Sequence, residues 1–335
     1  MSTKLEIQGD VRRAPDFSKN WTGNDPVGGQ NGHGLGPRFL LRTAVVRLAR
    51  HTYGWIKLRG ARSEARDLRI APQGSALRAL VDQHDKNIAA LAAQPFVCAT
   101  WPSAVRLTRM IEHCAVIDQL GPPFNLTRDQ YLEILHFDLD EQQCRLMIDQ
   151  PEWLGSDGLL SASLWVGDHR IFSISFCLSG CEQTRTAYIG GIQGRKHPDT
   201  LEQYRRLTKA AHGIRPRDLM FELFRMLLPQ LQVVELKGVS NSARYQMTKR
   251  MFLSVDTNDQ VLLDYDEIWQ SRGGVNAHDG FYLLPVKRER RDPDQVPPRK
   301  RSMYARRYAW LDKLGSELSE ALGSRLIVHS HRREC

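Results

Sequence analysis

The sequence lacks any uninterrupted apolar run long enough to cross a membrane, a span that needs about 20 residues. Its 335 residues are 41% hydrophobic and 25% charged, which is typical of a soluble globular protein with a substantial core. The first six residues, MSTKLE, have no apolar stretch of the kind found in secretory signals. These absences predict a cytoplasmic protein without a transmembrane segment, and they leave open a peripheral contact with the inner membrane.

The sequence also lacks the common catalytic and metal-binding motifs. There is no HExxH, no GxSxG, no phosphate-binding P-loop and no paired-carboxylate pattern. The six cysteines are scattered, and the one close pair, Cys177 and Cys181, does not have metal-ligand spacing. We therefore expect reduced thiols and no metal site, and the sequence identifies no particular cofactor.

Positive charge is in excess. The chain has 47 Lys and Arg against 38 Asp and Glu, a formal net charge of +9. Such an excess favours phosphates, nucleic acid or an anionic membrane surface as partners, although a solvated basic surface is the plainer interpretation. Two predicted basic amphipathic helices, at 38–59 and from 300 onward, could contact anionic lipid or pack on their own domain. Nucleic acid is the weaker alternative.

Composition and periodicity divide the chain into four parts. Residues 1–37 are rich in Gly, Asn, Pro and Asp and predict a disordered tail. Residues 38–123 predict a helical region, residues 124–287 a sheet domain, and residues 288–335 a charged linker followed by a basic helix.

The sheet domain begins with short strand-like segments that alternate apolar and small polar residues. Segments at 159–166, 170–178 and 184–189 predict an antiparallel meander with a tight turn at Gly167-Asp168. Two helices, a strand at 232–239, a short helical segment and a last strand then follow. A helix followed by a strand after a meander implies a crossover connection, so we expect an α+β fold with a mixed, mainly antiparallel sheet.

A glycine-rich segment, YIGGIQG at 188–194, ends the predicted meander. Three glycines in five residues indicate a sharp turn, or a backbone that something approaches closely. The structural alternative is a bulge and a tight turn without any ligand. We predict that any functional site lies at the end of this strand.

Basic residues follow in the first helix after the glycines. Lys209 and His212 share a helix face, and Arg215 and Arg217 come next. Such a cluster can grip a phosphate or a carboxylate, with His212 as a general base. The alternative is a helix end whose cations complement the helix dipole. Ser240, directly after the 232–239 strand, is a candidate catalytic residue or a capping residue.

Several segments together resemble the VirK/YbjX family of bacterial proteins. The resemblance covers residues 40–320 and rests on the glycine segment and on LTKAAHGIRPR, KGVSN, YDEIW, GFYLLP and the basic helix at 300–308. It implies a role in virulence, in resistance to cationic antimicrobial peptides and in maintenance of the Gram-negative envelope. It supplies no catalytic residues.

The predicted order of elements is similar to that of the GNAT acyltransferases. In that fold a glycine-containing turn binds the donor pyrophosphate at a helix N-terminus. The resemblance implies a phosphate-bearing acyl donor held by Gly190, Gly191, Gln193 and Gly194, with Lys209, Arg215 and Arg217 as further contacts. Tyr282 becomes a candidate general acid beside His212 and Ser240, and its alternative role is a core aromatic. The strict glycine spacing of the family is absent, and two helices follow the glycines where one is usual.

Two hypotheses follow for function. The first is an acyl-type transferase that acts on an envelope-related acceptor. The second is a non-catalytic accessory protein that binds anionic lipid or an envelope partner. The enzyme hypothesis requires the glycines, the 209–215 cluster, Ser240 and Tyr282 to meet in one cleft.

Overall fold

A computed structural model describes residues 12–13, 71–83, 92, 94–128, 130–151, 154–194, 199–244, 263–288 and 290–323. The predicted helix at 38–59 and almost all of the predicted tail at 1–37 lie outside these ranges. Arg195 and Lys196, directly after the glycine segment, also lie outside them. Every helix within the described ranges is too short or too polar to span a bilayer.

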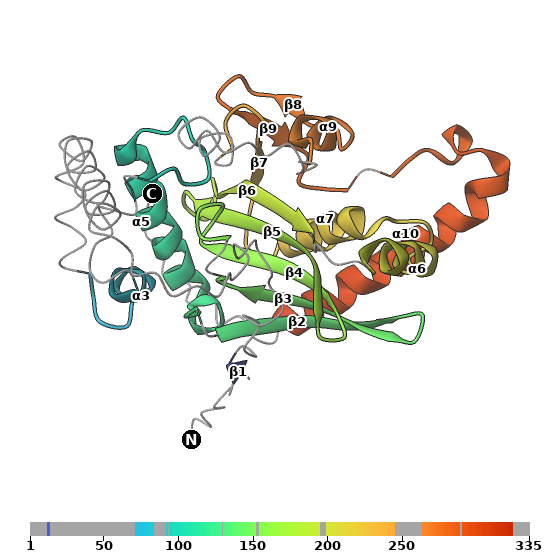
Figure 1. The fold of residues 1–335 in the computed structure, drawn as a ribbon, viewed down its shortest axis with the longest axis horizontal. Helices are drawn as coiled ribbons and strands as arrows, with labels where there is room; N and C mark the ends of the chain where they lie inside the picture. Colours follow the sequence, from blue (N-terminus) through green and yellow to red (C-terminus); the bar gives the residue numbers. More distant parts are fainter. Residues whose placement is uncertain are drawn as a thin grey trace, which may run out of the picture.

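One sheet forms the centre of the described structure (Figure 1), with the strands in the order β1-β2-β3-β4-β5-β6-β7-β9-β8. Neighbouring strands are antiparallel except for β6 and β7, which are parallel. The strands are β1 (Arg12–Arg13), β2 (Gln130–Leu139), β3 (Gln142–Asp149), β4 (Leu160–Val166), β5 (His169–Ser179), β6 (Thr186–Gly194), β7 (Glu235–Val239), β8 (Val275–Asn276) and β9 (Phe281–Leu284).

Helices cover the sheet and connect its strands. The helices α6 and α7 make the crossover between β6 and β7, and α9 lies between β7 and β8. The described helices are α3 (Ala76–Gln83), α5 (Ser103–Leu120), α6 (Thr200–Ala210), α7 (Pro216–Leu227), α9 (Tyr265–Gln270) and α10 (Pro298–Gly323), with short 3-10 turns η4 (Pro122–Phe124) and η6 (Pro293–Gln295).

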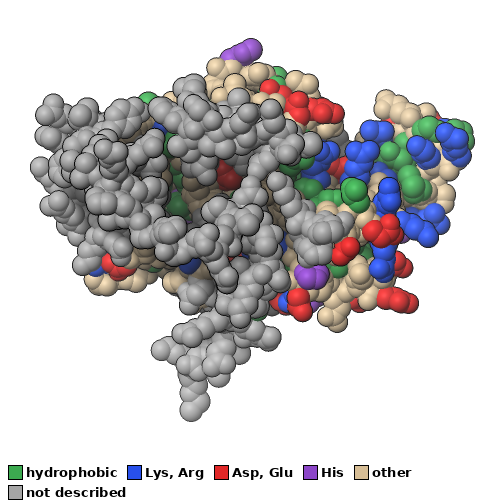
Figure 2. Space-filling model, viewed as in Figure 1, with side chains coloured by type: hydrophobic (Ala, Val, Ile, Leu, Met, Phe, Trp, Pro, Cys, Tyr) green, Lys and Arg blue, Asp and Glu red, His purple; other side chains and the backbone are tan. Residues whose placement is uncertain are grey.

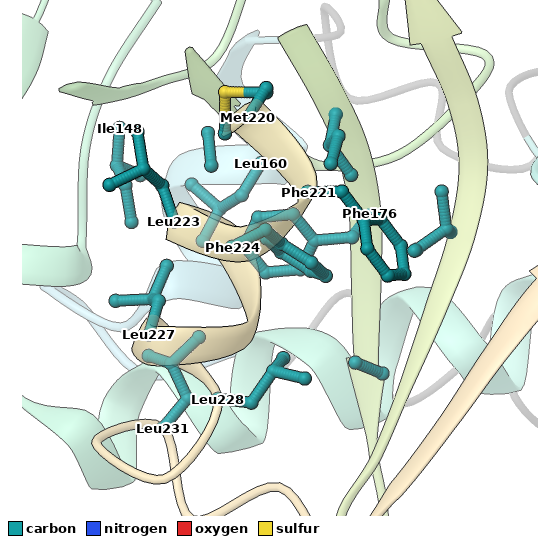
Figure 3. Packing of buried hydrophobic residues seen from close by; sticks show 14 of the residues in the cluster. Ile148, Leu160, Phe176, Met220, Phe221, Leu223, Phe224, Leu227, Leu228 and Leu231 are labelled. Carbon is teal, nitrogen blue, oxygen red and sulfur yellow. The ribbon is translucent and has the colours of Figure 1, made fainter. Parts of the chain in front are cut away.

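The helices α5 and α7 lie on opposite faces of the sheet. The Cys177 thiol of β5 contacts the carbonyl of Arg109 in α5, whereas the neighbouring Phe176 ring packs on Phe224 of α7. Successive side chains of a strand point to opposite faces, so these two contacts define an α5 face and an α7 face. On the α7 face, Met220 and Leu223 contribute to an apolar layer with side chains of the central strands (Figure 3).

The last helix has two different halves. Its C-terminal half is part of the core through Leu311, Leu314, Leu318 and Leu322, each at most 2% exposed. This half packs on α7 and β2, whereas the N-terminal half projects from the body of the protein (Figure 1). Apolar residues at a spacing of three or four define the packed stripe, and the charged N-terminal half lacks such a stripe.

The α+β class with a mixed, mainly antiparallel sheet is confirmed. The predicted meander, the crossover and the order of the later elements are observed. Of the two explanations predicted for the glycine segment, the sharp turn is wrong, because β6 continues through residues 190–194 to Gly194. The two-residue strand β8 was not predicted, because a pair of exposed residues carries no periodic pattern. The predicted domain boundaries stay predictions.

Candidate functional site

The glycine segment is a strand that carries a bulge. Ser175 of β5 pairs with Gly191 and Phe176 pairs with Ile189, so Gly190 is an extra residue without a partner on β5. A bulge re-aims the side chains that follow it and often lies beside a functional site. The bulge that we considered from the sequence is therefore present, within the strand rather than at its end.

The glycines are needed because other parts of the chain lie directly against this strand. A Cβ on Gly190 would come within 2.2 Å of the Asp157 carbonyl oxygen, and one on Gly191 within 2.7 Å of the Asp157 carboxylate. A Cβ on Gly194 would come within 2.8 Å of the Phe172 ring. Side chains at these positions would force the covering segments away, so the missing Cβ atoms allow close packing over the bulge.

The bulge lies where the two parallel strands separate. The pairing of β6 with β7 runs from Thr186 and Glu235 to Ile189 and Gly238, and β6 then continues without β7. We call the point where β6 and β7 separate the fork. Beyond the fork, α9 lies beside β6 in the place that a neighbouring strand would occupy. Its Tyr265 hydroxyl receives a hydrogen bond from the Ile192 N–H (2.7 Å) and donates one to the Ile192 carbonyl (3.1 Å).

The Trp269 side chain of α9 closes the β7 side of the fork. Its indole N–H donates to the Val239 carbonyl at 2.8 Å, and a Cβ on Gly238 would lie 2.5 Å from its ring. Asn241, directly after β7, fixes the start of α9, because its side-chain carbonyl accepts from the Tyr265 N–H at 2.9 Å. The lack of a side chain at Gly238 and the polar side chain at Asn241 thus position both aromatic residues of α9.

Charged groups surround the Tyr265 hydroxyl. Burial and then the nearby Asp157 carboxylate raise the pKa of Tyr265, while the Ile192 N–H and the Arg244 guanidinium oppose the rise. The Arg244 guanidinium lies 4.8 Å from the centre of the Tyr265 ring and donates to the Leu263 carbonyl. The phenol therefore stays protonated at neutral pH and can act as a proton donor.

A strip of polar side chains leads across the α5 face to this point. Asp149 of β3 pairs with Ser161 of β4, Ser161 with Ser175 of β5, and Ser175 with Gly191 of β6. The two serine hydroxyls are 2.6 Å apart, and both residues are buried. The strip therefore runs over four strands and ends beneath the Asp157 carboxylate.

A second row of the strip contains a half-buried arginine. Ser163 and Ser173 lie with their hydroxyls 3.0 Å apart, and Arg170 donates to both. The same guanidinium forms an ion pair with Asp149. Because Ile171 has no partner on β4, the register shift turns Arg170 toward the serines. We call Asp149, Ser161, Ser163, Arg170, Ser173 and Ser175 the polar strip.

Two of the predicted catalytic residues lie near the fork but face other groups. The Ser240 N–H donates to the Gly280 carbonyl at 2.9 Å, and its hydroxyl is 3.0 Å from that of Ser242. Tyr282 pairs with Gly238 across β7 and β9, and its hydroxyl accepts from the Gln270 amide at 3.1 Å. Both residues are at most 5% exposed, so their observed contacts are those of the packed interior.

The basic cluster lies at the far end of α6. The His212 ring packs on Trp310, and its carbonyl accepts two hydrogen bonds from Arg307 of α10. Lys209 and Arg215 are exposed, and Arg217 is paired with Asp218. Lys209 is nine residues beyond Thr200, which is roughly 13 Å along α6 from its first residue. The structure does not bring the predicted residues together in one cleft.

A small cavity of about 20 Å³ lies elsewhere, between α3, α5 and the sheet, and includes none of the predicted residues. It borders His113, whose Nδ1 accepts a hydrogen bond from the Leu178 N–H. Burial lowers the pKa of His113 to about 3, so the ring is neutral. In the described ranges, no group of three or more His, Cys, Asp and Glu side chains could hold a metal ion.

Asp157, Arg244 and the polar strip were not predicted as site residues from the sequence. Two sequence patterns could have revealed the polar strip. The patterns Ser-Ala-Ser and Ser-Ile-Ser recur in adjacent predicted strands at 161–163 and 173–175, and two hydroxyl rows on neighbouring strands can pair. Asp157 carries no local signal, because only the folded chain brings it onto Gly191.

The comparison with protein families decides the assignment. Residues 53–320 match a family described as "Protein of unknown function (DUF535)". The chain belongs to this family. The DUF535 match covers α3 to α10 and therefore includes the fork, the polar strip and most of the described helices.

Curated relatives agree with the DUF535 assignment and with the VirK/YbjX resemblance. The "Uncharacterized protein YbjX" of Escherichia coli (strain K12) is 32% identical over 146 residues, 44% of this chain and 43% of that protein. Two uncharacterized proteins of Haemophilus influenzae are 36% and 32% identical over 135 and 134 residues. The chain covers 43% of the length of each relative. No solved structure matches.

Proposed function

We propose that this DUF535 protein is an acyl-type transferase that serves the bacterial envelope and works at the fork of β6 and β7. The proposal rests on one observation: beyond the fork, both backbone groups of Ile192 are bonded to the Tyr265 hydroxyl instead of a strand. A single side chain occupies the place where an extended ligand could pair with the strand. The Asp157 carboxylate lies over the adjacent Gly191.

The donor in this proposal has an amide-bearing arm and a phosphate, as carrier-linked acyl groups do. The arm pairs with the N–H and C=O of Ile192, in the way that an added strand pairs with a free sheet edge. Its phosphate lies at Gln193 and Gly194, the latter six residues before the first residue of α6, and a helix N-terminus favours negative charge. The absence of side chains at Gly190 and Gly191 then leaves room for Asp157. Lys209 lies in the last turn of α6, and Arg215 and Arg217 lie at the start of α7, so the proposal assigns them no contact with this phosphate.

The chemical step uses two groups beside Gly191. The acceptor hydroxyl or amine gives its proton to the Asp157 carboxylate and attacks the acyl carbon, forming the new C–O or C–N bond. The bond from the acyl carbon to the donor sulfur or oxygen breaks. The leaving atom takes the proton of the Tyr265 hydroxyl, which the donor arm has displaced from Ile192. The polar strip supplies hydroxyl groups that can orient the acceptor.

The first experiment is a thermal unfolding series with coenzyme A, acyl-coenzyme A, acyl carrier protein and tRNA. A ligand at 100 times its dissociation constant adds about 2.7 kcal/mol of stability, which such a series resolves. We expect stabilisation by a phosphate-bearing acyl donor, and a larger shift in Tyr265→Phe, whose Ile192 groups have lost their internal partner. The matched control is Tyr282→Phe, which should respond as the unsubstituted protein does. No shift with any donor would refute the transferase proposal.

The second candidate function is an accessory protein of the envelope that binds an anionic partner without catalysis. The exposed cations of α6 and α10 favour it. The two functions are distinguished by the thermal series, because an accessory protein would bind an anionic surface and ignore every acyl donor.

A further inference from the structure

Two segments of the described structure are strongly basic. Residues 205–217 contain five Lys and Arg and no acid, and residues 287–310 contain nine Lys and Arg and three acids. Together they hold a net charge of +11, which exceeds the +9 of the whole chain. The remaining residues together carry a small negative charge, although residues 1–70 are basic as well, with 13 Lys and Arg against 6 Asp and Glu.

The fold joins these two segments into one surface. Arg307 of α10 donates to the His212 carbonyl from both Nε and Nη2, at 3.1 and 2.8 Å. Met303 lies against Gly213, where a Cβ would meet its sulfur at 3.4 Å. Gly213 has a φ of 79°, so a larger residue would be strained here as well as crowded. The turn after α6 therefore packs directly against the N-terminal half of α10.

Exposed cations from both segments surround this junction. In Figure 2 the Lys and Arg side chains gather on the lobe made by α10 and the segment before it. We call the following exposed residues the basic face: Arg205, Arg206, Lys209, Arg215, Arg299, Lys300, Arg301 and Arg306. Leu201 is 70% exposed and lies one helical turn before Arg205, so an apolar side chain lies next to one of these cations.

The aromatic residues of the lobe are not available as stacking platforms. The Arg307 and Arg291 guanidinium groups lie 4.4 and 6.0 Å from the centre of the Tyr304 ring. Those of Arg288 and Arg290 both lie 5.6 Å from the Tyr308 ring. Proteins that bind single-stranded nucleic acid stack bases on open aromatic faces, and here arginines already lie over these rings. This arrangement stiffens the lobe and disfavours base recognition.

We propose that the basic face binds the phosphate-bearing headgroups of an anionic lipid surface. Cations beside an exposed leucine suit the headgroup region, where charge meets phosphate and the apolar side chain enters the boundary with the acyl chains. Each basic residue near such a surface contributes about 1 kcal/mol, a factor of about five in affinity. The inference does not depend on the transferase proposal, because the basic face lies away from the fork.

The test is co-sedimentation of the full chain with vesicles. Neutral phosphatidylcholine vesicles are compared with vesicles that contain phosphatidylglycerol, at low and high salt. We expect binding to the anionic vesicles only, and loss of binding at about 0.5 M salt, where the Debye length falls to about 4 Å. Lys300→Ala and Arg306→Ala should each weaken binding about fivefold, and the double variant about 25-fold.

The matched control is Lys313→Ala. Lys313 is an exposed lysine of the same helix, in the half that packs on the body of the protein. The Lys313→Ala variant should bind anionic vesicles with an affinity within twofold of that of the unsubstituted protein. Thermal unfolding should show that all variants are folded. Absence of binding to anionic vesicles at low salt would overturn the proposal, as would equal losses in Lys300→Ala and Lys313→Ala. Tighter binding to a single-stranded oligonucleotide than to anionic vesicles would assign the basic face to nucleic acid instead.

Discussion

The Tyr265 hydroxyl forms hydrogen bonds with both the N–H and the C=O of Ile192, at 2.7 and 3.1 Å. A residue of α9 thereby satisfies the backbone of β6 at the point where β7 has separated from it. Tyr265 is 4% exposed, so water has little access to these groups. This contact connects the stability of the fork with its proposed chemistry.

Tyr265→Phe should therefore destabilise the protein. The substitution leaves two buried backbone groups without a partner, and each unsatisfied group costs about 1–3 kcal/mol. The Tyr282 hydroxyl bonds only the Gln270 side chain in the described structure, so Tyr282→Phe should cost less. Urea unfolding of both variants measures the difference. Equal losses of unfolding free energy in the two variants would show that the Tyr265 hydrogen bonds to Ile192 stabilise the protein no more than the Tyr282 hydrogen bond does.

Glycine substitutions test the close packing at the fork. A Cβ on Gly191 would lie 2.7 Å from the Asp157 carboxylate and one on Gly238 2.5 Å from the Trp269 ring. Gly191→Ala and Gly238→Ala should each destabilise by about 1–3 kcal/mol, the usual cost of overpacking. The control is Gly315→Ala in α10, whose Cβ would have 3.8 Å to its nearest neighbour. That variant should gain about 0.5–1 kcal/mol from helix propensity.

The ion pair between the buried Asp149 and the half-buried Arg170 should be costly to break. Removing one partner of such a pair typically costs 3–5 kcal/mol, so Arg170→Met should lower stability by that amount at pH 7. Burial already raises the pKa of Asp149, and loss of Arg170 raises it further. The deficit should therefore shrink as the pH falls and Asp149 becomes protonated. The control is Arg145→Met, which removes a more exposed ion pair with Glu133. It should lower the unfolding free energy by about 0–1 kcal/mol, both at pH 7 and at acid pH.

His113 should make the protein less stable in acid. Its folded pKa is about 3, against an ordinary value of 6.5, so between these values the unfolded chain binds a proton that the folded chain does not. Stability is then lost as the pH falls from about 6.5 toward 3, by up to about 1.4 kcal/mol per pH unit. His113→Asn keeps an acceptor for the Leu178 N–H and removes the titration. Its unfolding free energy should vary less over this range, and an identical profile would exclude His113 as the cause.

Local sequence patterns predicted most of the fold. The alternation at 159–166 and 170–178, with Gly167-Asp168 between them, predicted two strands and a tight turn, and β4 and β5 are joined in that way. Pro216 and the helical spacing of Leu219, Leu223 and Leu227 predicted α7. The glycines after Ile189 predicted either a sharp turn or a backbone that another group approaches closely, and the second is observed, because Asp157 and Val97 lie against Gly190. No local pattern identifies which segment makes that contact.

The candidate site was less predictable than the fold. The glycine segment belongs to the strand of the proposed site. Ser240 and Tyr282 contact packed neighbours, and the His212 carbonyl accepts a hydrogen bond from Arg307 of α10. Asp157 lies 34 positions before Gly191 in the sequence and meets it only through the register of β4, β5 and β6. Tyr265 reaches Ile192 across 73 positions. Contacts of this kind depend on topology, which residue periodicity does not encode.

The most direct test of the transferase account is amide hydrogen exchange of residues 190–194 with and without a saturating acyl donor. The account predicts that the donor replaces the Tyr265 hydroxyl on Ile192, so protection should change at Ile192 and its neighbours in β6 and at Tyr265 in α9. Residues of β3 and β4 serve as the internal reference and should keep their rates. A donor that binds and leaves β6 unchanged, or that alters exchange only around α10, would contradict the assignment of the site to the fork.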